Sequence, residues 1–342
     1  MSQLKVAVIG AGSIALYRHL PEYAMREDVE IVAICDIKEE HVERVAEDYN
    51  TKAYTDYKEA ITESGANLVS VCLPNYLHAP VSIFALEQGK HVLCEKPMAT
   101  SHEEAEEMIE ASKKAGKKLM IGHNQRFVPS HQKAREIIAN GELGRIYSFH
   151  TTFGHGGPEG WSADGMNSWF FRKEEAFIGA LGDLGVHKAD LIRYILGEEF
   201  TEIAAIVESS AKENSEVDDQ ALCVLRSENG VIGTLTASWA YKGIEDNSTV
   251  IYGEKGNLRL EDDPSYSLIA SFTDGTRINY ELGQIQTNNN GGQTSTGVID
   301  HFVDSVLNNT ESLINGEEGH KSLSIILAAL EANETKRNVT IS

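Results

Sequence analysis

The sequence predicts an α/β protein built from two domains, and three observations support this fold class. Residues 1–123 alternate near-continuous apolar runs with helical segments, which is typical of a parallel sheet covered by helices on both faces. A Gly-x-Gly-x-x-Ala turn follows the first apolar run directly. Residues 124–342 instead contain mostly alternating apolar and polar strands. We therefore expect a doubly wound parallel sheet in the first domain. In the second we expect an α+β arrangement with a large open, mostly antiparallel sheet.

Length, composition and charge narrow the class of protein. A chain of 342 residues, with 41% hydrophobic and 24% charged side chains, can bury the cores of two domains. The formal net charge of −22 argues against nucleic acid or an anionic membrane as a partner, because phosphates would be repelled. No stretch approaches the roughly 20 apolar residues of a membrane span. We expect no signal peptide before the first strand and a cytoplasmic location.

The four cysteines stand singly, three of them in apolar runs. No Cys-x-x-Cys pair occurs, so the sequence predicts neither a zinc site nor a disulfide framework. We expect all four to be reduced, buried side chains, and we expect no metal.

The N-terminal segment has the layout of a dinucleotide-binding βαβ unit. Its first apolar run, residues 4–9, leads into the turn, where Gly10 permits a sharp bend. Gly12 lets the backbone approach a pyrophosphate, because no Cβ stands in the way. The helix that follows offers unpaired N–H groups and a positive dipole end to the phosphates, beginning at Ser13 and Ile14. A purely structural strand-to-helix turn is the alternative.

The second apolar run, residues 31–35, ends at Asp36. A carboxylate there can accept hydrogen bonds from both ribose hydroxyls. It also repels a 2′-phosphate, and the next residue is Ile37 rather than an arginine that could bind one. Lys38 lies close enough to weaken this repulsion. The sequence therefore predicts NAD as the cofactor, with NADP less favoured.

Polar residues also follow the later apolar runs of the first domain. These runs and the helices among them are expected at 38–48, 67–73, 78–88, 91–95, 101–115 and 118–123. Ligands of parallel sheets bind beyond the carboxyl ends of the strands. The residues that we place at those ends are Asp36, Pro74, Asn75, Glu95, Lys96, Pro97, His123 and Asn124.

The second domain is expected to be built on its antiparallel sheet. Its strands are predicted at 145–153, 202–209, 219–226, 231–240, 248–252, 257–260 and 267–279. Its helices are predicted at 129–140, 183–196, 298–308 and 318–333. We expect the last two helices to pack back toward the first domain. The Gly- and Asn-rich stretch 287–297 predicts a loop near the site or at a subunit contact.

The tripeptide Glu95-Lys96-Pro97 stands where a nicotinamide and its substrate would meet. The ammonium of Lys96 can hydrogen-bond a substrate hydroxyl and stabilise its alkoxide, because a cation offsets the developing negative charge. Glu95 can hold the lysine or a ribose. The alternative is a solvated Lys–Glu pair on the surface.

A second chemical cluster lies in the segment 179–190. Asp183 and His187 are four residues apart and Asp190 follows three later, so in a helix all three share one face. His187 has an ordinary pKa close to neutral, which suits proton transfer to or from an alcohol. Asp183 can orient the imidazole or bind a substrate hydroxyl. A surface ion pair is the alternative, and a metal site would lack further ligands.

Five motifs occur together in the order of a known family. They are Gly-x-Gly-x-x-Ala, Pro74-Asn75-x-x-His78, Glu95-Lys96-Pro97, Asn124-x-Arg126-Phe127 and Gly179-Ala-Leu-x-Asp183-x-Gly-x-His187-x-x-Asp190. With this set the chain closely resembles the Gfo/Idh/MocA oxidoreductases, which include glucose–fructose oxidoreductase-like and inositol dehydrogenase-like enzymes. The resemblance implies an N-terminal Rossmann domain, and a C-terminal α/β domain whose open sheet forms homodimers or homotetramers. It also implies NAD(P)-dependent oxidation of a secondary alcohol on a sugar or cyclitol.

The resemblance further implies roles for individual residues. Lys96 matches the family's active-site lysine, His187 its acid/base histidine and Asp183 its substrate-contacting acid. The cofactor contacts that it leads us to expect are Gly10, Gly12, Ser13, Ile14, Asp36, Leu73, Pro74, Asn75, His78, Glu95, Lys96, Asn124, Trp169 and Arg172. The expected substrate contacts are Lys96, Arg126, His155, Trp161, Asp183 and His187.

Two segments depart from the family pattern. Phe177-Ile178-Gly179 replaces a frequent glycine triplet, which leaves the shape of that loop open. The segment 152–167 is individual to this chain. Its polar groups beside Trp161 suit a sugar, whose C–H face stacks on a ring while its hydroxyls hydrogen-bond. A core or interface role for Trp161 is equally compatible.

The sequence thus predicts an NAD-dependent dehydrogenase of a sugar or inositol-like polyol, with Lys96, Asp183 and His187 as the catalytic residues. Two alternatives in the same fold stay open. One is an enzyme that uses bound NAD transiently, as in glycoside cleavage. The other is a dinucleotide-sensing regulator, against which the presence of both Lys96 and His187 argues, because a sensor needs no proton transfer.

Overall fold

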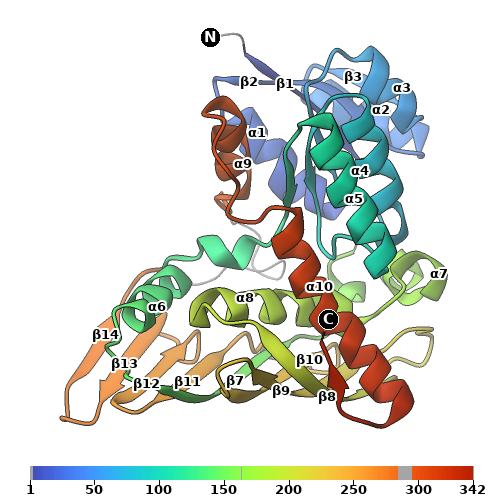
Figure 1. Cartoon of the computed structure of the whole chain (residues 1–342). Helices are drawn as coiled ribbons and strands as arrows, with labels where there is room; N and C mark the ends of the chain where they lie inside the picture. The colour runs from blue at the N-terminus through green and yellow to red at the C-terminus, as the bar shows by residue number, and fades with distance from the viewer. Residues whose placement is uncertain (1–2, 163, 284–294, 342) are drawn as a thin grey trace. The chain divides into compact units, whose positions relative to one another are not determined.

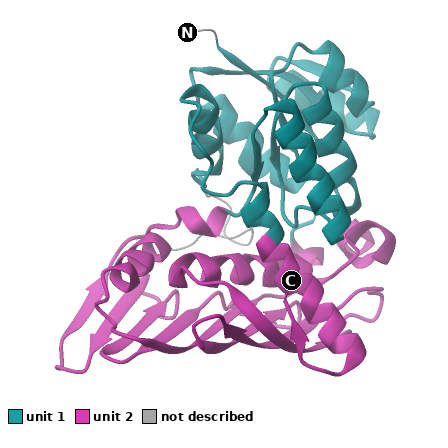
Figure 2. Ribbon diagram, viewed as in Figure 1, with its two compact units in different colours: residues 1–123, 161–164, 288–320 teal, residues 124–160, 165–287, 321–342 magenta. Residues whose placement is uncertain are grey.

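The computed structural model describes residues 3–162, 164–283 and 295–341 (Figure 1). These residues form two compact units, which Figure 2 colours separately. Unit 1 comprises residues 1–123, 161–164 and 288–320, and unit 2 comprises residues 124–160, 165–287 and 321–342. Most of the stretch 287–297, for which we predicted a loop, lies outside the described residues.

Unit 1 is built on a six-stranded sheet in the order β3-β2-β1-β4-β5-β6, in which every neighbouring pair is parallel. The strands are β1 (Leu4–Ile9), β2 (Val29–Cys35), β3 (Lys52–Tyr54), β4 (Leu68–Val71), β5 (His91–Cys94) and β6 (Leu119–Ile121). The strand order reverses between β1 and β4, and ligands of such sheets bind at this point, beyond the carboxyl ends. The predicted parallel sheet is confirmed. The three-residue β3 is too short for its pattern to have predicted it.

Local sequence signals determine where the helices of unit 1 begin and end. Helix α5 follows Ser101, whose side chain accepts a hydrogen bond from the N–H of Glu104, and ends at Gly116 with a left-handed φ of 61°. The helix after the glycine turn is less regular than predicted, because Ala15–His19 form a π-helical turn. The α-helices are α1 (Leu20–Ala24), α2 (Glu39–Asp48), α3 (Tyr57–Glu63), α4 (His78–Glu87), α5 (His102–Ala115) and α9 (Val298–Leu307). Figure 1 shows α4 and α5 side by side.

Unit 2 contains a nine-stranded sheet in the order β14-β13-β12-β11-β7-β10-β9-β8-β15. All neighbouring strands are antiparallel except β7 and β10, which confirms the predicted mostly antiparallel sheet. The strands are β7 (Ile146–Gly154), β8 (Phe200–Glu208), β9 (Gln220–Ser227), β10 (Ile232–Ser238), β11 (Thr249–Gly253), β12 (Gly256–Leu260), β13 (Leu268–Phe272), β14 (Arg277–Tyr280) and β15 (Val339–Thr340).

The single strand predicted at 267–279 is wrong. The structure divides it into β13 and β14, which form an antiparallel hairpin. Asp274 accepts a hydrogen bond from the N–H of Thr276, and Gly275 has a φ of 90°. An Asp-Gly pair between two apolar runs is a turn signal that outweighs the continuous strand pattern.

Helices cover one face of this sheet, and Figure 1 shows α6 and α8 along that face. The α-helices of unit 2 are α6 (Pro129–Ala139), α7 (Lys173–Ala176) and α8 (Val186–Leu196). A further helix, α10 (Gly316–Thr335), contains the division between the units at residue 320. Among the described residues, no helix has both the length and the apolar content to span a membrane. All four cysteines are buried and free.

Candidate active site

The glycine turn after β1 has the shape that a dinucleotide requires. Gly10 has a φ of 97°, and a Cβ there would lie 2.2 Å from the carbonyl oxygen of Cys72, so only glycine fits. At Gly12 an added Cβ would meet no atom within 4 Å, so the space on this side is open for a pyrophosphate. Ser13 donates a hydrogen bond from Oγ to the backbone oxygen of Trp161, at 3.4 Å. Ile14 follows directly and precedes the π-helical turn.

Asp36 is fixed at the carboxyl end of β2. Its Oδ2 accepts a hydrogen bond from the N–H of Ala11 at 3.0 Å, and its Oδ1 accepts one from the N–H of Lys38 at 3.0 Å. Ile37 between them is 88% exposed. These backbone contacts hold the carboxylate beside the glycine turn, as a ribose-binding acid requires. The side chains present therefore fit NAD.

Four of the predicted cofactor contacts, Leu73, Pro74, Asn75 and His78, follow β4. His78 is buried, with Nδ1 2.7 Å from the carbonyl oxygen of Pro97 and Nε2 2.8 Å from that of Leu73. Burial lowers the pKa of His78, and a neutral ring donates to one of these oxygens at a time. Both of its ring nitrogens thus face backbone oxygens of the protein, and the predicted cofactor contact of His78 stays a prediction. The residue ties the segment after β4 to the segment after β5.

Glu95 is held by His19, a residue that our sequence analysis missed. His19 Nε2 lies 2.9 Å from Glu95 Oε1, and its Nδ1 lies 2.9 Å from the hydroxyl of Ser70. The other carboxylate oxygen of Glu95 accepts the N–H of Lys96 at 3.2 Å. Lys96 itself is half-buried. The sequence did contain a signal for this contact: His19 lies in the first helical turns after the glycines, and this segment must pack on the sheet.

Charge stabilises this arrangement of Glu95. Burial disfavours the charged form of His19, but the neighbouring Cys72 and Glu95 outweigh it and raise the pKa of His19 well above its usual value. Burial likewise disfavours the charged carboxylate, but His19 and then Lys96 lower the pKa of Glu95 below its usual value. His19 and Glu95 therefore form an imidazolium–carboxylate pair, and the carboxylate of this pair belongs to the residue directly before Lys96.

In unit 2, Asp218 shapes the loop that replaces the family's glycine triplet. Its carboxylate accepts the N–H groups of Gly179 at 2.7 Å and Leu181 at 2.8 Å. A Cβ on Gly179 would lie 1.8 Å from the backbone oxygen of Asp218, so this glycine is required. Phe177 has a φ of 67°, an uncommon value for a residue with a side chain. Asp218 is not among the predicted site residues, although the sequence has two adjacent aspartates directly before a strand.

Asp183 lies in a π-helical turn, Leu181–Gly185, rather than in the regular helix predicted at 183–196. The N–H of Val186 bonds to the carbonyl oxygen of Leu181, five residues earlier. Asp183 is buried, and its Oδ2 accepts a hydrogen bond from the indole N–H of Trp239 at 3.1 Å. π-Helical turns are frequent at functional sites.

Asp190, the third residue of the predicted helix face, binds an arginine in the structure. It accepts both Nε and Nη2 of Arg126, at 2.8 and 2.7 Å, in a fully buried pair. The hydroxyl of Ser322 donates to it at 2.9 Å. A buried carboxylate needs a buried cation, and in this structure the carboxylate of Asp190 is bound inside the protein. Arg126, predicted as a substrate contact, supplies that cation.

His187 is half-buried at the start of α8. Its ring centroid lies 5.9 Å from that of Phe153. The ring centroid of Phe153 also lies 5.9 Å from that of His155. The Nδ1 of His155 accepts the N–H of Gly157 at 2.9 Å, so this predicted substrate contact also supports its own loop. Lys188, next to His187, is fully buried and donates to the backbone oxygen of Asn247; burial lowers its pKa to about 7.

The remaining predicted cofactor contacts lie at other places in unit 2. Trp169 stacks on Phe170 with ring centroids 3.9 Å apart. Arg172 is exposed and pairs with Glu175 at 2.8 Å. Asn124 opens a 3-10 turn that continues to Phe127. Unit 1 therefore gathers the glycine turn, Asp36 and Trp161, while unit 2 gathers Asp183, His187 and His155.

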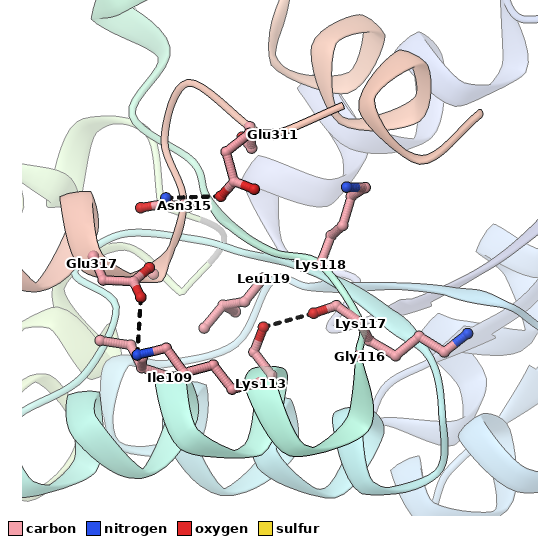
Figure 3. Close-up of a pocket in the computed structure, with 12 residues that line it drawn as sticks. Ile109, Lys113, Gly116, Lys117, Lys118, Leu119, Glu311, Asn315 and Glu317 are labelled. Carbon is pink, nitrogen blue, oxygen red and sulfur yellow. Dashed lines mark hydrogen bonds and ion pairs between the residues drawn. The ribbon is translucent and has the colours of Figure 1, made fainter. Parts of the chain in front are cut away.

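A separate pocket of unit 1, of about 360 Å³, contains none of these residues (Figure 3). It is lined by α5 and the start of α10, and it lies at the amino end of β6, whereas ligands of parallel sheets bind at carboxyl ends. Lys113 pairs across it with Glu317 at 3.1 Å, and Asn315 donates to Glu311 at 2.9 Å.

Comparison with known proteins agrees with this geometry. Residues 4–123 match the family model described as an oxidoreductase family with an NAD-binding Rossmann fold, and residues 131–259 match the GFO/IDH/MocA C-terminal domain. D-glucoside 3-dehydrogenase of Escherichia coli (strain K12) is 38% identical over 57% of this chain. That match spans only 55% of the length of the relative.

Two further proteins resemble the chain along its length. Myo-inositol 2-dehydrogenase of Thermotoga maritima is 26% identical over 99% of this chain and 98% of the relative. The structure of levoglucosan dehydrogenase in complex with NADH and levoglucosan has a TM-score of 0.86, with 25% identity over 99% of this chain and 100% of that one. Together with the two family models, these matches confirm what the five motifs predicted: the chain belongs to the Gfo/Idh/MocA family of oxidoreductases, with an NAD-binding Rossmann fold in residues 4–123.

Proposed function

We propose that this protein oxidises a secondary alcohol on a sugar or cyclitol ring, with NAD as the hydride acceptor. The observation that most favours catalysis is the support given to the segment before His187. Asp218 binds Gly179 and Leu181 through their N–H groups, and Trp239 binds the carboxylate of Asp183. A protein that only sensed the dinucleotide would not need such a preorganised acid and histidine.

In this proposal each side chain has one task. His187 accepts the proton of the reacting hydroxyl, because its ordinary pKa is close to neutral. Lys96 offers its ammonium to the oxygen on which negative charge develops. Asp183, held by Trp239, binds the hydroxyl or the imidazole in the orientation that transfer requires. Bound NAD supplies the acceptor for the hydride.

The substrate is expected to be a polyhydroxylated ring. The segment 152–167 contains the polar side chain of His155 and the aromatic ring of Trp161, which would suit a sugar hydroxyl and a sugar C–H face. The named relatives act on a glucoside, an inositol and levoglucosan, which are all ring polyols.

The test is a panel of aldoses, glycosides and cyclitols, read by the absorbance of NADH. We expect at least one of them to be oxidised. His187→Ala should lower kcat by at least about 100-fold and change NAD affinity less than twofold, because general-base catalysis contributes about that much. His150→Ala, an exposed histidine on β7, is the matched control and should leave kcat unchanged. Equal losses of kcat and NAD affinity in His187→Ala would refute the proposed role.

One outcome of this panel would favour the enzyme that uses NAD transiently. NAD would then copurify with the protein, and substrate would be consumed without net release of NADH. Cofactor binding with no consumption of any polyol would favour the regulator.

We also infer that the uncovered face of the unit 2 sheet pairs with a second copy of the chain. Ile206, Leu222, Val224 and Ile232 are 61, 57, 57 and 48% exposed, and Ile206 and Leu222 are opposite each other on β8 and β9. An apolar patch of this kind marks a protein interface. Leu222→Glu should convert the homodimer or homotetramer to smaller species in sedimentation. A wild-type monomer would contradict the inference.

A further inference from the structure

Lys38 carries the positive charge nearest to Asp36 in the sequence, and its ammonium is already bound. Lys38 Nζ lies 2.9 and 3.3 Å from the two carboxylate oxygens of Asp164. Asp164 lies more than a hundred residues away in the chain, yet residues 161–164 belong to unit 1. Trp161 of the same segment accepts a hydrogen bond from Ser13 in the glycine turn. The segment therefore lies beside the place where the adenosine half of the coenzyme is expected.

A second cation that follows Asp36 in the sequence, Arg44, is also hydrogen-bonded. Arg44 on α2 donates a hydrogen bond to Nδ1 of His41 at 3.0 Å, and Nε2 of His41 donates to the carbonyl oxygen of Ala11 at 2.8 Å. Asp36 itself accepts only backbone N–H groups in the contacts described. A 2′-phosphate on the ribose would thus meet a carboxylate, with Lys38 as the nearby group able to attract it.

We propose that Asp164 is a specificity-determining residue that favours NAD over NADP by binding the ammonium of Lys38. The ion pair removes the cation that a 2′-phosphate would need, and the Asp164 carboxylate adds a second negative charge close to that position. NAD carries an uncharged hydroxyl at that position, so neither effect should change its binding. This inference rests on the proposed function, which gives NAD as the coenzyme. It concerns the choice between NAD and NADP and not the transfer of the hydride.

The experiment compares Asp164→Asn, Lys38→Ala and the double variant. Each apoprotein is titrated with NADH and with NADPH, and binding is followed by the fluorescence of the reduced nicotinamide. Asp164→Asn should tighten NADPH binding about fivefold, because one exposed charge contact a few ångströms long is worth about that factor. NADH binding should change less than twofold. The double variant should lose the gain, and high salt should reduce it, since both partners are about half exposed.

Asp48→Asn is the matched control, because it removes the same charge from an exposed position of unit 1 at the end of α2. Unchanged NADPH binding in Asp164→Asn, an equal gain in Asp48→Asn, or parallel loss of both coenzymes would each overturn the inference. The fluorescence titration needs no substrate. If the titration shows the switch while no polyol is oxidised, the selectivity role stands and the proposed reaction fails.

Discussion

His19 Nε2 lies 2.9 Å from Glu95 Oε1, in a pair whose side chains are 3% and 12% exposed. Breaking a buried ion pair by removing one partner typically costs about 3–5 kcal/mol, because the remaining charge is left uncompensated. We expect His19→Gln to lower the free energy of unfolding by about that amount in urea denaturation. Adding Glu95→Gln should recover much of the loss, which a double-mutant cycle would reveal. Additive losses would contradict a direct interaction.

The contribution of this pair should also depend on pH. The pKa of His19 is raised in the folded protein, so its contribution to the free energy of unfolding is complete below the ordinary pKa of 6.5. That contribution is lost as the pH rises through the pKa of His19 in the folded protein. The pKa of Glu95 is lowered in the folded protein, so its contribution to the free energy of unfolding is present above pH 4.5, its ordinary pKa, and is lost at more acidic pH. The effect of His19→Gln on stability should therefore be largest between about pH 4.5 and 6.5. A difference that grows toward pH 9 would contradict this assignment.

Gly12 should be required for the coenzyme but not for the fold. An added Cβ meets no protein atom within 4 Å, so Gly12→Ala should leave the urea midpoint unchanged. The same methyl group would occupy the space that a pyrophosphate needs, and NAD binding should weaken at least tenfold in a fluorescence titration. Gly160→Ala, where an added Cβ also meets nothing, is the control and should leave binding intact.

Variants of Arg126 can distinguish a structural role, in the buried pair with Asp190, from the predicted contact with substrate. We expect Arg126→Ala to lower the free energy of unfolding by about 3–5 kcal/mol, because Asp190 would remain buried with weaker partners. Arg126→Lys should lose less, since it keeps the charge but not the two parallel hydrogen bonds. A variant of unchanged stability with a raised KM for the polyol would contradict the structural role and support the predicted substrate contact.

The parallel sheet of unit 1 could be predicted from sequence because its strands are buried on both faces and read as continuous apolar runs. Gly10, Gly12 and Asp36 could be placed for the same reason, since they end those runs. The hairpin of β13 and β14 was not predicted, because the residues on both sides of the Asp274-Gly275 turn have the pattern of one continuous strand.

The partners of the polar side chains could not be predicted in the same way. A motif indicates which residue types occur, but the fold decides where each side chain points. Spacing predicted that Asp183 and Asp190 share one face of a helix, but it could not predict that one bonds to Trp239 and the other to Arg126. His19 and Glu95 are 76 residues apart, and only the packing of the first helical turn on the sheet brings them into contact.

Asp218 gives the sharpest prediction for the loop before His187. Burial raises the pKa of Asp218 to about 6, and the N–H groups of Leu181 and Gly179 oppose that rise only in part. A raised pKa means that its contribution to stability is complete below its ordinary value of 3.8 and is lost as the pH rises through about 6. Asp218→Asn cannot titrate. The stability of the wild type relative to Asp218→Asn should therefore fall by at most about 3 kcal/mol between pH 4 and pH 7, and then level off. Urea denaturation across this range measures it, and a constant difference would show that Asp218 is not desolvated in the fold.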